Sequence, residues 1–158
     1  MKIRSFEPQD AEECENILID AFGWYFKLKG SSWLKKRLKK TELKNSAAEG
    51  ITLVAEDEGR IVGYIHASLA AYGVAYISTV GISSLSQGKG VGKLLLKELE
   101  ETCKKARVRK IWLMVGHINH DAVLFYLKNG YLMEGVMKDM TLNGLHSIIM
   151  SKQIISGS

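Results

Sequence analysis

The stretch Gln87-Gly88-Lys89-Gly90-Val91-Gly92 decides the fold of this chain. It follows an apolar, strand-like run over residues 76–82 and opens a helix-like run over residues 91–106. Glycines just before a helix remove side chains from the turn, so several backbone N–H groups can face outward together. The positive end of the helix dipole lies behind them, and such an arrangement binds phosphate. The stretch therefore predicts a protein that binds a phosphorylated cofactor.

Two other phosphate-binding motifs fail to fit this stretch. A P-loop needs Ser or Thr after its Gly-Lys pair to hold magnesium, whereas Gly90 follows Lys89 here. A dinucleotide fingerprint needs its third glycine one residue later than Gly92, and an acidic residue at the end of the next strand. That strand is expected over residues 110–115 and ends in Val115. Both readings are excluded by the chemistry that the motifs serve.

A third pattern, Gln/Arg-x-x-Gly-x-Gly/Ala, does fit, with Gln87, Gly90 and Gly92 at its fixed positions. An ordinary glycine-rich helix start is the alternative. A second motif favours the first reading. Asn119 and Tyr126 stand seven residues apart, on one face of a helix that Asn129-Gly130-Tyr131 closes. Over residues 51–150 the two motifs together resemble the GCN5-related N-acetyltransferases, a family that binds acetyl-coenzyme A.

The resemblance implies a mixed α+β fold. The family has a mostly antiparallel sheet of six to seven strands, flanked by helices, with two central strands that splay apart. Periodicity along this chain gives a compatible order, β-α-α-β-β-β-α-β-α-β-β. Helices are expected near residues 8–22, from residue 33, and at 91–106 and 119–128; strands at 2–6, 51–55, 61–70, 76–82, 110–115, 131–142 and 145–153. We expect one domain over residues 1–158, with a disordered tail at 154–158.

The composition is that of an ordinary globular protein, with 158 residues, 46% hydrophobic and 25% charged. No apolar run reaches the length of a membrane span, and the N-terminus lacks a signal peptide. Cys14 and Cys103 have neither metal-binding nor redox spacing. We therefore expect a reduced, cytoplasmic protein without a metal site. The net charge of +5 suits an anionic cofactor and supports nucleic-acid binding only weakly.

The resemblance also implies roles for individual residues. The pantetheine arm of the coenzyme would bond to the backbone of Val80, Gly81 and Ile82. Asn119 would bond the coenzyme near that arm, although Asn is also favoured as a helix N-cap. Tyr126 stands at the position of the general acid that protonates the departing thiolate, with packing on the sheet as the alternative. The pyrophosphate cradle would consist of Gln87, Gly88, Lys89, Gly90, Val91, Gly92 and Lys93.

The general base is not identified by the resemblance. A lysine-type amine has a free pKa of ~10.4, so it must lose a proton before it attacks. Histone-type members carry Glu where this chain has Tyr76, and ribosomal-protein N-terminal acetyltransferases carry Glu where it has Met114. Both differences argue against those two activities. The remaining candidates are a chain of water molecules that ends on backbone carbonyls, His117, His66, Glu49 and Glu56.

The acceptor site is expected in the N-terminal part of the chain. The basic run over residues 35–40 is interpreted as a solvated helix face, with an attractive surface for an acidic partner or substrate as the alternative. The leading hypothesis is an N-acetyltransferase that moves an acetyl group from acetyl-coenzyme A to a primary amine, on a small molecule or a peptide. A non-catalytic coenzyme A sensor and a homodimer are kept as open alternatives. Aromatic residues for an acceptor pocket, or for the core, are Trp24, Tyr25, Phe26 and Trp33.

Overall fold

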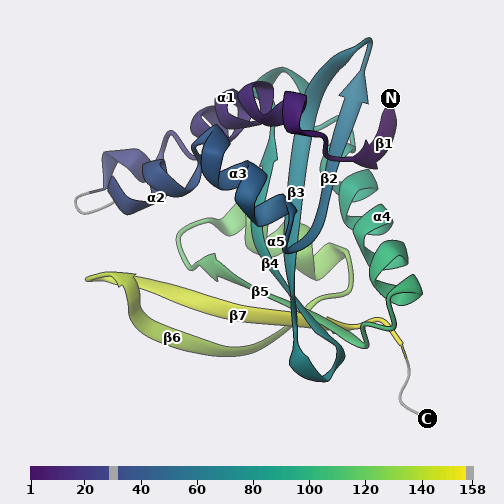
Figure 1. Ribbon diagram of the computed structural model, residues 1–158. Helices are drawn as coiled ribbons and strands as arrows, with labels where there is room; N and C mark the ends of the chain where they lie inside the picture. The colour runs from purple at the N-terminus through teal and green to yellow at the C-terminus, as the bar shows by residue number, and fades with distance from the viewer. Residues whose placement is uncertain (29–31, 156–158) are drawn as a thin grey trace.

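The computed structural model describes residues 1–28 and 32–155, which form a seven-stranded sheet flanked by helices (Figure 1). The sheet order is β1-β2-β3-β4-β5-β7-β6. The strands are β1 (Lys2–Ser5), β2 (Gly50–Asp57), β3 (Arg60–Ala70), β4 (Val74–Ile82), β5 (Lys110–Gly116), β6 (Leu132–Leu142) and β7 (Leu145–Gln153). The helices are α1 (Ala11–Ala21), α2 (Ser32–Arg37), α3 (Lys40–Ala47), α4 (Val91–Lys105) and α5 (His120–Lys128). The expected mixed, mostly antiparallel fold is confirmed.

One pair of neighbouring strands, β4 and β5, is parallel, because α4 carries the chain across between them. Val74–Ile77 of β4 pair with Lys110–Leu113 of β5, and among the described residues the two strands do not pair beyond this segment. The last residues of β4 instead pair only with β3, and those of β5 with β7. The sheet therefore opens between the two strands, as the splayed central strands of the expected fold require.

The two faces of the sheet carry different helices, as Figure 1 shows. Alternate residues of β2 point to opposite faces, so Leu53 belongs to one hydrophobic cluster and Val54 to the other. The first cluster includes Leu95 of α4 and Val123 of α5, and we call its side the α4–α5 face. The second includes Leu18 of α1 together with residues of α2 and α3, and we call its side the α1–α3 face.

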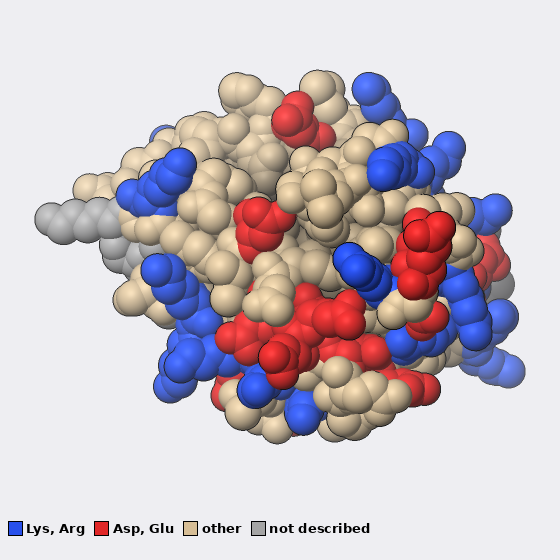
Figure 2. Space-filling model, turned by 90° about the horizontal axis from the view of Figure 1, so that it is seen from above, with Lys and Arg blue, Asp and Glu red and all other residues tan. Residues whose placement is uncertain are grey.

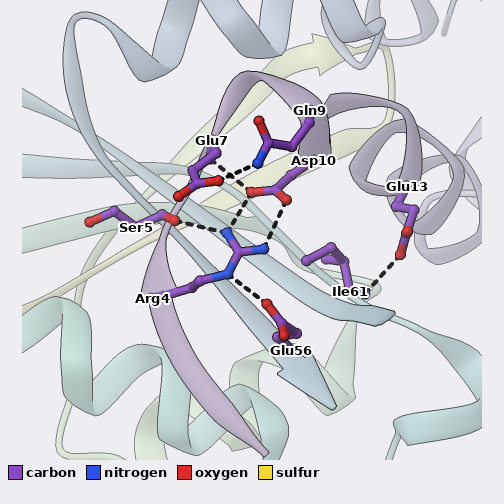
Figure 3. Close-up of polar contacts among 8 residues, drawn as sticks. All are labelled: Arg4, Ser5, Glu7, Gln9, Asp10, Glu13, Glu56 and Ile61. Atoms are coloured by element: carbon purple, nitrogen blue, oxygen red, sulfur yellow. Dashed lines mark hydrogen bonds and ion pairs between the residues drawn. The ribbon is translucent and has the colours of Figure 1, made fainter. Parts of the chain in front are cut away.

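The first strand is tied to α1 by a group of ion pairs (Figure 3). The guanidinium of Arg4 donates to both carboxylate oxygens of Asp10, at 2.7 and 2.9 Å, and to Glu56 at 2.7 Å. Burial of Asp10 raises the pKa of its carboxyl group, but the bonds from Arg4 and the Glu7 N–H outweigh it and leave that pKa below its ordinary value. At the other side, Glu13 accepts a hydrogen bond from the Ile61 N–H at 2.8 Å. These contacts fix α1 against the edge of the sheet.

Two features of the fold differ from the sequence-based expectation. A helix, α3, lies between α2 and β2, where we expected only one helix before the strand. The basic run is therefore not one helix face: α2 ends at Arg37, Leu38 is buried, and α3 begins at Lys40. The expected disordered tail also does not hold for Ile154 and Ile155, whose N–H groups donate to the Arg109 carbonyl at 2.9 and 3.3 Å. Residues 156–158 lie outside the described chain.

Charged side chains are distributed unevenly over the surface. Figure 2 shows Asp and Glu gathered near the middle of the face seen from above, with Lys and Arg mostly toward its margins. Cys14 and Cys103 are free, buried thiols, and burial raises their pKa to about 12 and about 11. Among residues 1–28 and 32–155, no helix combines the length and apolar character that a membrane crossing needs.

Candidate active site

A cleft of about 930 Å³ lies where β4 and β5 separate. Its lining comes from both faces of the sheet. Gly92 and Phe125 contribute from α4 and α5, whereas Leu34 and Leu38 contribute from the α1–α3 face. The end of β4 and the end of β5 form the walls between them. The cleft therefore gives two ligands separate approaches that meet at the gap in the sheet.

The glycine cradle lies at the α4 end of this cleft. Gly88 and Gly90 have φ values of +74° and +82°, which side chains rarely adopt, and no atom lies within 4 Å of a Cβ built on either glycine. Gly90 is also the N-cap of α4, so no side chain caps the first N–H groups of that helix. Its first turn carries no acidic residue. An open space beside uncapped N–H groups fits a phosphate group.

The strand before the cradle is held close to α1. A Cβ on Gly81 would lie 2.5 Å from the Cδ2 of Leu18, which is fully buried, so only glycine permits this approach. Val80, Gly81 and Ile82 all line the cleft. Gly81 therefore packs against α1, while it and its two neighbours form part of the cleft wall.

Asn119 caps α5, as the alternative reading of that residue expects. Its Oδ1 accepts a hydrogen bond from the Ala122 N–H at 3.2 Å, which satisfies one of the free donors of the helix start. Asn119 also lines the cleft. The cap fixes the start of α5 beside the gap in the sheet. Asn119 therefore has a structural role in α5 that does not depend on any contact with a ligand.

Tyr126 lines the cleft from α5 and is only 7% exposed. Its ring packs edge to face against Phe125 and Tyr131, with centroids 5.2 and 5.4 Å away. Burial, followed by the proximity of the Tyr76 hydroxyl, raises the pKa of Tyr126 well above its ordinary value. The phenol is therefore fully protonated at neutral pH. A protonated hydroxyl at a cleft wall can act as a proton donor.

Every residue predicted for the cofactor site, and Tyr126, lines the cleft except Lys89, whose side chain is exposed beside the cradle. Tyr76 and Met114, which replace the glutamates of two branches of the family, line the cleft as well. The structure thus brings together the two sequence motifs, which residues 93–118 separate in the chain.

The four candidate bases do not line the cleft. His66 is buried, with Nδ1 2.7 Å from the Thr52 Oγ1, and His117 Nδ1 accepts the N–H of His146 at 3.1 Å. Glu56 is bonded to Arg4, and Glu49 is an exposed residue just before β2. No histidine or glutamate of the described residues lines this cleft.

The aromatic residues expected for an acceptor pocket or for the core do not all lie in one place. Trp24 and Tyr25 line the cleft, but Phe26 does not; it packs with the α1–α3 cluster, and the Lys35 Nζ lies 5.2 Å from its ring centroid. The side chain of Trp33 lies outside the described structure. Other polar residues of the lining were not predicted for the site: Arg37, Ser78, Thr79, Ser86, Asp121, Lys128, Asn129 and Ser147. Arg37 belongs to the basic run, which was the only signal for it.

The chain is similar to two uncharacterized proteins of Bacillus subtilis (strain 168). It is 34% identical to YdhI over 83 residues, which are 52% of this chain and 49% of that protein. It is 32% identical to YxbD over 78 residues, 49% of this chain and 47% of that protein. The match spans about half the length of each of these curated relatives.

Solved structures share the whole fold at low sequence identity. The PaiA N-acetyltransferase of Thermoplasma acidophilum, solved in complex with coenzyme A, has a TM-score of 0.84 and 24% identity over 96% of this chain and 98% of that one. An aminoglycoside 6'-acetyltransferase of type Ii has a TM-score of 0.83 and 21% identity over all of both chains. The ribosomal-protein-alanine N-acetyltransferase of Brucella melitensis has a TM-score of 0.81 and 22% identity over 97% of this chain and 99% of that one.

A match to a protein-family model shows which family the chain belongs to. The model of the acetyltransferase (GNAT) family matches residues 12–131, which include all but the first residue of α1, and the glycine cradle, α4 and α5. The match covers well over half of the chain and contains both motifs of the cleft. The chain therefore belongs to the acetyltransferase (GNAT) family.

Proposed function

We propose that this protein transfers the acetyl group of acetyl-coenzyme A to a primary amine by direct attack. The observation that carries the proposal is the single cleft that reaches both faces of the sheet. Its α4–α5 face holds an open phosphate cradle, and its α1–α3 face holds an aromatic and apolar wall. Two substrates bound from the two faces would meet at the gap between β4 and β5.

The coenzyme would occupy the α4–α5 face. The N–H groups of residues 87–93 would bind its pyrophosphate, with Lys93 adding a positive charge at the cleft wall. The backbone of residues 80–82 would bind the pantetheine arm, and Asn119 would lie beside it. When bound, acetyl-coenzyme A supplies an activated acyl group and a thiol leaving group. The chain's own part is to fix that group at the gap in the sheet.

Tyr126 would donate the proton that the departing thiolate takes up, and the phenolate left behind would regain a proton from solvent water. It lies at the cleft wall, and a phenol, with an ordinary pKa of ~10, is protonated across the neutral range. Its ring is held by Phe125 and Tyr131, so the hydroxyl is positioned in advance. With the four candidate bases outside the cleft, the attacking amine would lose its proton to water.

Two measurements on the purified protein test the proposal. Calorimetry measures coenzyme A affinity, and a thiol reagent measures coenzyme A release from acetyl-coenzyme A in the presence of a panel of primary amines. Binding together with amine-dependent thiol release is expected. Binding without release for any amine would instead favour the non-catalytic sensor, and no binding would contradict both functions.

A further inference from the structure

Arg37, the last residue of α2, lines the cleft from the α1–α3 face. It is exposed, and the cleft residues on either side of it in sequence are apolar: Leu34 is half-buried and Leu38 is 1% exposed. Tyr76 of β4 lines the same cleft. A guanidinium therefore stands in a wall that is otherwise largely aliphatic and aromatic on this side.

This guanidinium has no partner among the described residues. Two neighbouring cations do, since Lys35 lies over the ring of Phe26 and Lys40 forms an ion pair with Glu12, whereas the side chains of Lys36 and Lys39 make no such contact among the described residues. Arg4 is fully engaged by Asp10 and Glu56. Arg37 makes no hydrogen bond or ion pair in residues 1–28 and 32–155. Five N–H donors in a planar fork are thus left available at the cleft wall.

The position of Arg37 separates it from the phosphate cradle. The cradle lies at the start of α4, on the opposite face of the sheet from α2 (Figure 1). The coenzyme has its own cation there, Lys93, and the remaining charged residues of the lining, Asp121 and Lys128, belong to α5. A charge on the α2 side is therefore placed for the second substrate rather than for the coenzyme.

The electrostatic influence of Arg37 extends to the proposed reaction centre. Burial raises the pKa of Tyr76, and the positive charge of Arg37 opposes that rise. The same charge, after burial, lowers the pKa of His66. Tyr76 in turn influences Tyr126, the proposed acid. An anionic group bound by Arg37 would therefore lie in the part of the cleft where the acceptor is expected.

We infer that Arg37 selects acceptor amines that also carry a negatively charged group, a carboxylate or a phosphate. The inference rests on the proposed function and names the class of its second substrate. Arginine pairs with both kinds of anion through two parallel N–H···O bonds, and such charge-assisted bonds are stronger than neutral ones. The amine would then extend from this anchor toward the gap in the sheet. Amines that carry a second positive charge would be repelled by the same guanidinium.

A set of matched acceptor amines tests this inference. They share one benzene ring and one aminomethyl group, and they differ in whether the second substituent is anionic, neutral or cationic. They are 4-(aminomethyl)benzoate, 4-(aminomethyl)benzamide and 1,4-bis(aminomethyl)benzene, each also as its 1,3-isomer so that a single spacing does not decide the result. A fourth compound, 4-(aminomethyl)phenyl phosphate, distinguishes phosphate from carboxylate. Two readouts are used: kcat/KM for thiol release with acetyl-coenzyme A, and binding to the coenzyme A complex by calorimetry, which needs no turnover.

The variants are Arg37→Gln, Arg37→Lys and, as the matched control, Lys36→Gln. Lys36 is exposed on the same helix and does not line the cleft. The substitution Lys36→Gln therefore removes the same charge from the same region without changing the cleft wall. The wild type is expected to favour the anionic over the neutral acceptor by about tenfold or more, and the neutral over the dicationic one. Arg37→Gln should abolish this preference, Arg37→Lys should keep part of it, and Lys36→Gln should keep all of it.

The outcomes separate this inference from the proposed function. Selective binding of the anionic amines without acetylation would retain the role of Arg37 and contradict the transferase. Acetylation with no charge preference, or with one that survives Arg37→Gln, would overturn the inference and leave the transferase standing. Absence of detectable binding by every anionic amine would overturn it as well.

Discussion

The rings of Tyr126 and Tyr131 meet edge to face, with centroids 5.4 Å apart and planes at 65°. Tyr131 is fully buried, whereas Tyr126 lines the cleft. The core thus holds one ring in place through the other, and α5 cannot rotate without breaking this contact. The two tyrosines therefore differ in surroundings: Tyr131 lies in the core, and Tyr126 is a residue of the cleft wall.

Tyr126→Phe should lower turnover while leaving the fold intact. The substitution keeps the ring and its packing and removes only the proton, and general acid catalysis typically contributes ~10²–10⁴-fold. We expect turnover to fall within that range, with coenzyme A affinity close to that of the wild type. Steady-state kinetics and calorimetry measure the two quantities. Unchanged turnover, with chemistry shown to be rate-limiting, would rule out the acid role.

Tyr131→Phe is the matched control for this variant. The Tyr131 hydroxyl is buried near Glu100 without a well-formed hydrogen bond, so its removal leaves no partner unsatisfied. Turnover should stay at the wild-type level, and the free energy of unfolding should not decrease. An equal loss of turnover in both variants would show that the effect at Tyr126 arises from packing.

Gly90→Val should abolish coenzyme A binding without unfolding the protein. A Cβ at Gly90 has no neighbouring atom within 4 Å, so the new side chain would enter the open space where we propose that phosphate binds. The residue has a φ of +82°, and a side chain there costs about 1–2 kcal/mol. Calorimetry with coenzyme A and urea denaturation measure the two effects separately.

The control for this strain is Gly59→Val, in the turn between β2 and β3. Gly59 has a φ of +76°, also has no atom within 4 Å of a built Cβ, and does not line the cleft. Its variant should lose a similar amount of stability and keep its coenzyme A affinity. Wild-type affinity in folded Gly90→Val would contradict the cradle.

The parts of the site that the sequence predicted all depend on local patterns. The glycine cradle and the spacing of Asn119 and Tyr126 are set by a turn and by one helix, so a few consecutive residues specify them. The N-cap bond from Asn119 to Ala122 is equally local. Strand positions followed from apolar runs and turn residues, and the seven-stranded order of the described sheet agrees with them.

The parts that sequence reasoning missed depend on contacts between distant residues. His66 was a candidate base because its residue type suits proton transfer, but strand register places it opposite Thr52, which binds its ring. Arg37 was read as one charge in a run, since nothing local shows that Leu38 is buried and turns the chain there. Helix α3 was missed because Leu43 is its only fully buried residue, so its periodicity is weak.

Stability should fall as the pH drops below about 6.5, in part because of His66. Burial, followed by the charge of Arg37, lowers the pKa of His66 in the folded protein. An unfolded histidine takes up a proton near pH ~6.5, whereas the folded one resists protonation to lower pH. The stabilising contribution is therefore complete above that pH and is lost as the pH falls toward the folded pKa.

Urea denaturation at several pH values between 7.5 and 5 measures this effect. His66→Gln keeps a polar group for Thr52 and removes the titration, so its stability should depend less on pH than that of the wild type. Identical slopes for the wild type and His66→Gln would contradict the prediction.

The acceptor should be an amine that loses its proton easily. No histidine or glutamate of the described residues lines the cleft, so the fraction of neutral amine in solution limits the rate. A peptide α-amino group has a free pKa of ~7.7–8.0 and a lysine side chain one of ~10.4, so the neutral fractions at pH 7 differ by a few hundredfold. Two peptides of the same composition separate the cases: one has a free N-terminus and a blocked lysine, the other the reverse. The kcat/KM of the first should level off above pH 8, while that of the second should keep rising about tenfold per pH unit. Equal turnover of both at pH 7 would mean that a group in the cleft, with Asp121 the first to test, removes the proton from the bound amine.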